Sequence, residues 1–272
     1  MEKARPQPSR GALKPATVVT GASSGIGREL ARAAARDGAG HAMLLIGLEH
    51  DALAELAAEM SAAGVEAHAL AVDLSGREAG ACIESKLAEI GAYCDVLVNS
   101  AGFGVFGAAA DADRRAQLDL IEVNIRALTE MTLRFLPGMI DRGRGGVLNV
   151  GSITGYLPGP NMATYFAAKA YVGSFTAALA QEVRGSGVTV TCLTPGVVRT
   201  PFFARCGVGQ TRLYKMAPHG NAPAVAAAGW RGFRAGKHLV IPRLVDRIIV
   251  GGSLLVPQAL LLRFVSAFLR PP

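Results

Sequence analysis

Cysteine, tryptophan and histidine are scarce in this chain of 272 residues, which has 4, 1 and 5 of them respectively. Cys82, Cys94, Cys192 and Cys206 are far apart and form no C-x-x-C pair, and no histidines stand at metal-ligand spacing. We therefore expect reduced thiols and no metal site. A disulfide-stabilised secreted fold is not indicated.

Acidic residues are also few, with 21 Asp and Glu against 28 Lys and Arg, for a formal charge of +7. Such an excess could attract nucleic acid or an anionic membrane. The sequence contains no basic stretch interleaved with aromatic residues and no nucleic-acid motif. We therefore expect no nucleic-acid partner, and a solvated surface that attracts an anionic cofactor is the simpler interpretation.

Long uninterrupted apolar runs are missing at both ends. Residues 1–14 lack the apolar run of a signal peptide, so we predict a disordered tail and a cytoplasmic protein. Charged residues interrupt the apolar stretch 244–269, and its longest uncharged run has 15 residues, short of the roughly 20 that span a bilayer. We predict that residues 244–272 form a helical extension packed on the domain or an interface. Association with a membrane surface is the alternative.

Strand-like apolar runs alternate with segments of helical period. The strands are expected at 17–20, 42–46, 66–72, 96–99, 146–150, 188–193 and 238–241, and helices at 26–36, 51–63, 112–136 and 163–184. This order is typical of an α/β Rossmann fold, a doubly wound sheet of about seven parallel strands with helices on both faces. We predict a single domain over residues 15–243.

Ligands bind such sheets beyond the carboxyl ends of the strands, where a glycine-rich loop follows Thr20. Glycines let the backbone approach a pyrophosphate, and the N-terminus of the following helix offers N–H groups to it. The pattern predicts a dinucleotide in contact with Gly21, Ser23, Ser24, Gly25, Ile26 and Gly27.

The G-x-x-x-G-x-G spacing after Thr20 resembles the short-chain dehydrogenase/reductase family, and further motifs follow in the family's order. They are Asp73 after the third strand, N-S-A-G at 99–102, Asn124, Ser152, Y-x-x-x-K at 165–169, and P-G at 195–196 followed by Thr200. The resemblance covers about residues 16–242. It implies a nicotinamide-dependent oxidoreductase that interconverts an alcohol and a carbonyl.

The resemblance also assigns roles to individual residues. The implied catalytic residues are Asn124, Ser152, Tyr165 and Lys169. The implied cofactor contacts, beyond the glycine loop, are Asp73, Leu74, Asn99, Ala101, Gly102, Tyr165, Lys169, Pro195, Gly196, Val198 and Thr200. Other interpretations are open for two of them, since Asp73 could cap the following helix and Asn99 could tie strands together. Relatives imply a homodimer or homotetramer through helices 112–136 and 163–184.

Tyr165 and Lys169 are four residues apart, so on a helix they share a face. A phenol has a pKa near 10, and a nearby ammonium lowers it, which makes Tyr165 usable as an acid or base. Ser152 can donate a hydrogen bond to the substrate oxygen as charge develops there. From the family, Asn124 is expected to bind a water that links Lys169 to solvent.

The choice of dinucleotide depends on residues 46–50, at the end of the second strand. Leu48 stands where many NADP-using relatives have arginine, and this departure leaves both cofactors open. Glu49 would suit NAD, whereas Ser24, Arg28 and His50 could surround the 2′-phosphate of NADP, which we favour slightly.

Several apolar residues follow strands four, five and six and predict an apolar substrate: Phe103, Phe106, Ile153, Tyr156, Leu157, Met162, Phe202, Phe203, Leu213, Tyr214 and Met216. Residues 200–221 are expected to form a mobile lid. The alternatives to a soluble enzyme are a non-catalytic dinucleotide sensor or scaffold and a membrane-associated reductase of lipid carbonyls.

Overall fold

The structure is a computed structural model that describes residues 13–37 and 40–269. Most of the predicted N-terminal tail lies outside the described residues. The predicted boundary of that tail was wrong at its end, because Lys14 begins the first strand and its N–H donates to the Gly91 carbonyl at 3.0 Å.

A seven-stranded sheet in the order β3-β2-β1-β4-β5-β6-β7, with every neighbouring pair parallel, forms the centre of the molecule. The predicted fold class is confirmed. The strands are β1 (Lys14–Thr20), β2 (Ala42–Gly47), β3 (Ala67–Ala71), β4 (Ala92–Asn99), β5 (Gly145–Val150), β6 (Val188–Leu193) and β7 (Leu239–Val240). The chain reverses direction across the sheet between β1 and β4, which is where such folds bind nucleotides.

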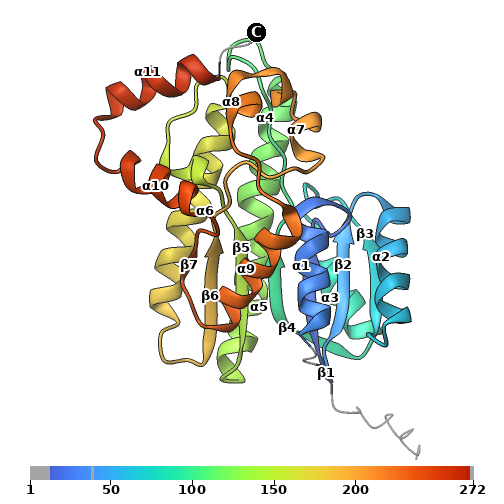
Figure 1. The fold of residues 1–272 in the computed structure, drawn as a ribbon. Coiled ribbons are helices and arrows are strands. Elements are labelled where there is room, and N and C mark those ends of the chain that lie inside the picture. The colour runs from blue at the N-terminus through green and yellow to red at the C-terminus, as the bar shows by residue number, and fades with distance from the viewer. Residues whose placement is uncertain (1–12, 38–39, 270–272) are drawn as a thin grey trace, which may run out of the picture.

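Helices cover both faces of the sheet (Figure 1). One face carries α1 (Gly25–Arg36), α2 (His50–Ala62) and α9 (Ala222–Arg234), and the other carries α3 (Ala79–Glu89), α5 (Leu128–Asp141) and α6 (Ala163–Glu182). Val19 faces Leu30 of α1, whereas its neighbour Val18 belongs to the opposite core with Ile83 of α3. This alternation follows from the strand period of two and produces two separate cores.

The single helix predicted at 112–136 is divided into three parts. It begins as α4 (Arg114–Ile121), passes through a π-helical turn η1 (Glu122–Ala127), and continues as α5. The Asp113 carboxylate caps α4 by accepting hydrogen bonds from its first backbone N–H groups. The π-helical turn holds Asn124, and such turns often occur at functional sites.

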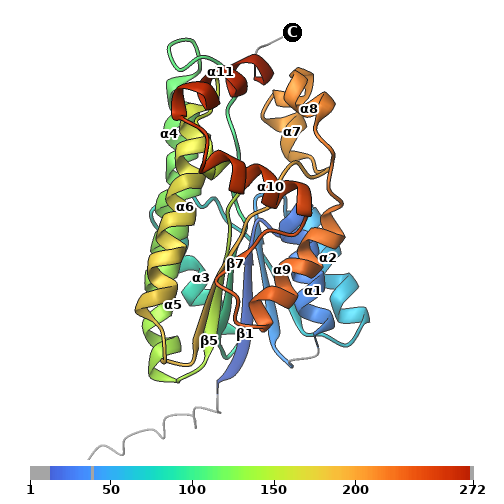
Figure 2. The same cartoon turned by 60° about the vertical axis from the view of Figure 1, so that its left-hand side comes forward.

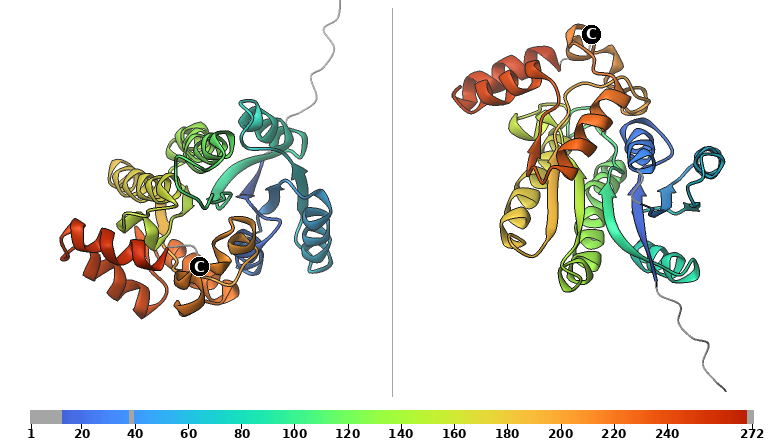
Figure 3. Two further views of the ribbon diagram at one scale, coloured as in Figure 1. Left: turned by 90° about the horizontal axis from the view of Figure 1, so that it is seen from above. Right: turned by 60° about the horizontal axis from the view of Figure 1, so that its bottom comes forward.

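The C-terminal part of the chain lies beyond the carboxyl ends of the strands (Figures 2 and 3). It contains α7 (Phe202–Arg205), η3 (Val208–Gln210), α8 (Arg212–Met216), α10 (Leu244–Ser253) and α11 (Gln258–Phe268), and η2 (Ile153–Tyr156) lies beneath α10. Val250, Val265 and Leu269 are buried, so α10 and α11 pack on the domain through one face. Within the described ranges, no helix has the length and apolar character needed to cross a membrane.

Candidate active site

The loop between β1 and α1 closes tightly because of its glycines. Gly21 and Gly25 have φ angles of +67° and +58°, a region that glycine adopts without strain. A Cβ on Gly21 would lie 2.8 Å from the Cα of Ala101, and one on Gly27 would overlap the Gly21 carbonyl oxygen. Ser24 makes no side-chain cap bond, so the first N–H groups of α1 stay available for an anion. This cradle fits a pyrophosphate.

Thr20 fastens the glycine loop to the segment that follows β4. Its hydroxyl accepts hydrogen bonds from the backbone N–H groups of Ser100 and Ala101, both at 3.1 Å. Ala101 and Gly102 border the pocket described below. The two loops therefore form one unit on the floor of that pocket.

Asn99 has the structural role that the sequence left open for it, which is to tie strands together. Its buried amide donates to the Asn149 side chain at 2.9 Å and to the Thr132 hydroxyl at 3.1 Å. These bonds tie β4 to β5 and α5. The Asn99 side chain does not border the pocket in the described part of the chain, so its predicted contact with the cofactor remains a prediction.

Asn124 uses both ends of its amide on the backbone of Phe103. Its Oδ1 accepts from the Phe103 N–H at 3.1 Å, and its Nδ2 donates to the Phe103 carbonyl at 2.9 Å. A Cβ on Gly102 would lie 2.8 Å from that same Oδ1. Asn124 thus positions the segment after β4, and the water-binding role implied by the resemblance stays a prediction.

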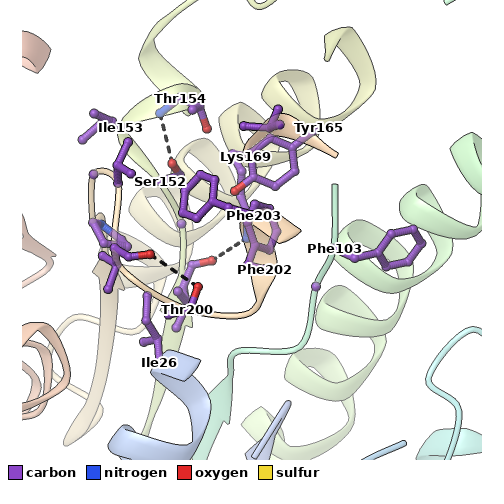
Figure 4. A pocket seen from close by; sticks show the side chains of 18 of the residues that line it. Ile26, Phe103, Ser152, Ile153, Thr154, Tyr165, Lys169, Thr200, Phe202 and Phe203 are labelled. Atoms are coloured by element: carbon purple, nitrogen blue, oxygen red, sulfur yellow. Dashed lines mark hydrogen bonds between the residues drawn. The ribbon is translucent and has the colours of Figure 1, made fainter. Parts of the chain in front are cut away.

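Ser152 and Thr154 place two hydroxyl groups on one side of the pocket (Figure 4). Ser152 follows β5, and its Oγ accepts a hydrogen bond from the Thr154 backbone N–H at 3.2 Å, so its own O–H can still act as a donor on the side of Tyr165. The Thr154 Oγ1 is buried and has no hydrogen-bond partner among the described residues. A buried hydroxyl of this kind gains from a polar ligand atom.

Tyr165 and Lys169 lie one turn apart on α6 and border the same pocket. The Lys169 Nζ donates to the Val150 carbonyl at 2.9 Å and lies 5.8 Å from the centre of the Tyr165 ring. The expected lowering of the Tyr165 pKa was wrong, because burial raises the pKa of this phenol above its ordinary value; hydrogen bonding to Ser152 opposes that rise. Burial lowers the pKa of Lys169 to about 8. At neutral pH the pair is therefore a neutral phenol beside an ammonium.

Four of the predicted cofactor contacts follow β6 and border the pocket: Pro195, Gly196, Val198 and Thr200. The Thr200 hydroxyl donates to the Val198 carbonyl at 3.4 Å. The Gly196 N–H donates to Asp246 Oδ2 at 3.2 Å, and Asp246 is buried against Arg243 with N–O distances of 2.8 and 2.6 Å. The hydrogen bond from the Gly196 N–H to the buried Asp246 carboxylate thereby anchors the apolar extension to this loop.

Asp73 is exposed and borders the pocket together with Leu74. Its carboxylate accepts a hydrogen bond from the Ser75 N–H at 2.8 Å and shapes a turn. The alternative role as the cap of the next helix is wrong, because α3 begins only at Ala79.

The end of β2 supplies a carboxylate. Glu49 borders the pocket, accepts a hydrogen bond from the Ser23 hydroxyl at 2.6 Å, and pairs with Arg205 of α7 at 2.9 Å. The bond from Ser23 lowers the pKa of the Glu49 carboxyl. Arg28 pairs instead with Glu55, and neither Arg28 nor His50 is among the described residues that border the pocket.

These elements enclose one pocket of about 1180 Å³ that runs from the glycine loop to Tyr165 and on to α10 and α11. We call its side formed by residues 200–268 the C-terminal wall. Of the apolar residues expected near the substrate, Phe103, Ile153, Leu157, Met162, Phe202, Phe203 and Met216 border it. Phe106, Tyr156 and Tyr214 do not, and the Leu213 side chain lies outside the described part. Figure 4 shows the Phe103 ring pointing away from Tyr165, whereas the Phe202 ring lies 5.4 Å from it.

Comparison with known proteins decides the family, since the short chain dehydrogenase family model matches residues 15–209. The chain belongs to the short-chain dehydrogenases. A short chain dehydrogenase of Pseudocercospora fijiensis is 37% identical over 199 residues, covering 72% of this chain but only 63% of that protein. Sulfoacetaldehyde reductase 2 of Chromohalobacter salexigens is 36% identical over 187 residues, covering 68% and 73% of the two chains. The structure of a short-chain dehydrogenase from Sphingobium yanoikuyae in complex with NADPH superposes with a TM-score of 0.77 at 30% identity, covering 90% and 97%.

Sequence reasoning missed three residues of this short-chain dehydrogenase's pocket region. Thr154 stands two residues after Ser152 and adds a hydroxyl. Arg205 reaches Glu49 from a short helix that carries no motif. Asp246 is one of the charged residues that interrupt the apolar stretch 244–269, and a lone acid in such a stretch is a signal for a buried partner.

Proposed function

We propose that this short-chain dehydrogenase interconverts a secondary alcohol and a ketone, or an aldehyde, on an apolar substrate with NADP or NAD as cofactor. The observation that carries the proposal is that Ser152, Tyr165 and Lys169 border the same pocket as the glycine loop. The NADPH bound by the Sphingobium structure supports the choice of cofactor.

The protonation states favour reduction of a carbonyl at neutral pH. Because burial keeps Tyr165 protonated, its phenol can donate a proton to the forming alkoxide. The nicotinamide, when bound, supplies the hydride. The O–H of Ser152 donates to the same oxygen, where the negative charge develops.

Lys169 has a positioning and an electrostatic role. One of its three N–H donors is used by the Val150 carbonyl, which fixes the side chain and leaves two donors toward the pocket. The resemblance assigns these to the ribose hydroxyls next to the nicotinamide. In the oxidative direction the ammonium would favour the Tyr165 phenolate.

The pair of Glu49 and Arg205 sets the balance between the two dinucleotides. A carboxylate at the end of β2 accepts hydrogen bonds from the ribose hydroxyls of NAD and repels the 2′-phosphate of NADP. Arg205 neutralises that carboxylate and is itself a partner for the phosphate. We therefore propose that both dinucleotides bind. Glu49 shifts the ratio of the two affinities toward NAD, and Arg205 shifts it toward NADP.

The charges of the pocket support an apolar substrate. Among its described residues, the cations are Lys169, which the Val150 carbonyl holds near Tyr165, and Arg205, which pairs with Glu49, so the rest of the pocket lining carries no positive charge.

Turnover with a panel of apolar ketones and alcohols, each with NADP(H) and NAD(H), tests the proposal, with sulfoacetaldehyde as the charged member. We expect activity on apolar members that Tyr165→Phe abolishes while binding of the cofactor persists. Binding without turnover on any member would favour the alternative, a non-catalytic dinucleotide sensor.

We further propose a cytoplasmic homodimer or homotetramer through α4, α5 and α6. Leu118 of α4 and Leu133 of α5 are 49% and 55% exposed, which leaves apolar surface for a second copy. Light scattering tests it, and a monomeric mass would refute it.

A further inference from the structure

The outward faces of α10 and α11, together with the turn 254–257 that joins them, expose many large apolar side chains. The six most exposed are Leu244, Ile248, Leu254, Leu255, Leu260 and Phe264, with exposed fractions between 54% and 86%. We call these six the apolar C-terminal face. Of 18 large apolar side chains exposed in the described residues, 10 lie between 244 and 264. Such a concentration marks an interaction surface rather than ordinary surface composition.

The exposed charges within the stretch 244–269 have one sign. Asp246 is the sole acidic residue in the described stretch 244–269, and it is 1% exposed because it pairs with Arg243. Arg247 and Arg263 are exposed and form no salt bridge with described residues. Apolar side chains flanked by unneutralised arginines complement the surface of a bilayer that contains anionic lipids.

The face is continuous with the mouth of the pocket. Ile248, Leu260 and Phe264 are largely exposed and at the same time border the pocket. A second copy packed here would cover the mouth and bring the arginines of two chains together. A lipid surface would instead place the mouth against the phase in which an apolar substrate is dissolved.

We propose that α10 and α11 lie in the plane of an anionic bilayer surface and dock the enzyme there, with the pocket opening toward the lipid. The docking stands on the two helices alone, while the delivery of an apolar carbonyl from the bilayer rests on the proposed function. Both helices are far shorter than a membrane span, with 10 and 11 residues, so they dock without crossing.

Co-sedimentation of the full chain with vesicles tests the docking, using phosphatidylcholine alone and phosphatidylcholine with phosphatidylglycerol. We expect pelleting with the anionic vesicles, and Leu255→Asp should weaken it about tenfold or more because an apolar contact is replaced by a charge. Leu13→Asp is the matched control, since it places the same charge on an exposed leucine (56%) away from α10 and α11 and should pellet as the wild type does. Arg263→Gln should weaken binding to the anionic vesicles only.

Turnover of a water-soluble ketone, measured on the same samples, separates the two proposals. Leu255 does not border the pocket, so Leu255→Asp should keep this turnover. Turnover without vesicle binding by the wild type would overturn the docking alone, and vesicle binding without turnover would overturn the proposed function alone. Equal pelleting of Leu255→Asp and wild type would also overturn the docking. If neither protein binds vesicles and Leu255→Asp lowers the oligomer mass, the face is an interface between two copies of the chain, and the docking is overturned.

Discussion

The glycine loop and the C-terminal wall border the same pocket but are held by different kinds of contact. In the loop, backbone meets backbone: Gly21 approaches Ala101, and Thr20 fixes two N–H groups of the next loop. In the C-terminal wall, side chains form the surface of the pocket, and many of them are exposed to solvent. The first region tolerates few residue types because its geometry leaves no space. The C-terminal wall accepts more residue types, and its side chains determine which substrate and which surface the enzyme contacts.

The largest effect is expected from a substitution in a loop that follows a strand, and it tests whether that loop takes part in the reaction. Ser152→Ala should lower kcat by about 10²–10³-fold, because it removes the donor to the oxygen that becomes charged. Steady-state kinetics with the best ketone of the panel measures it. Ser75→Ala, at another part of the same pocket, is the control and should change kcat little; equal losses in both variants would contradict the assignment.

The same substitution placed in each region sharpens the comparison. Gly27→Ala should weaken dinucleotide binding about 100-fold, because the new Cβ overlaps the Gly21 carbonyl and forces the loop open. Gly251→Ala on α10 should leave binding unchanged and stabilise the helix by about 0.5–1 kcal/mol, since nothing lies within 4 Å. Cofactor titration and thermal unfolding measure both. Similar behaviour of the two variants would show that the loop is not held as described.

Glu49 and Arg205 form the bridge between the two regions. Glu49→Gln should shift the ratio of kcat/KM values toward NADP by about tenfold, because repulsion of the phosphate is lost. Arg205→Gln should shift it toward NAD by a similar factor. Kinetics with both dinucleotides measures the ratio. Shifts in the same direction, or none, would place the pair away from the adenosine ribose.

The smallest expected effect is a dependence on pH. Lys169 has a pKa of about 8, below its ordinary value, so its ammonium is present below pH 8 and lost above it. Carbonyl reduction should be constant up to about that pH and then decline several-fold. The Tyr165 phenol does not cause the decline, because burial raises its pKa. Lys169→Arg should abolish the decline even if its rate is lower, and a decline that persists there would exclude Lys169.

The two regions also differ in how much of their structure could be predicted from the sequence. The positions of the strands along the chain followed from the apolar periodicity, whereas the roles of Ser152, Tyr165 and Lys169 followed from the resemblance to the family; spacing added only that Tyr165 and Lys169 share one face of a helix. The π-helical turn at Asn124 could not be predicted, because the pattern of apolar residues continues through it. Arg205 pairs with Glu49, and Asp246 accepts from the Gly196 N–H; in both cases the partner lies far away along the chain, so no local pattern identifies it.

Transfer of deuterium tests the central claim most directly. The reduced dinucleotide carries deuterium at both hydrogen positions of the reactive carbon of the nicotinamide, and the alcohol formed from an apolar ketone is analysed by mass spectrometry for wild type and Tyr165→Phe. We expect one deuterium on the carbinol carbon with the wild type and no product with Tyr165→Phe. Product without deuterium, or equal labelled product from both proteins, would contradict the assignment of Tyr165 as the acid in a hydride-transfer reaction.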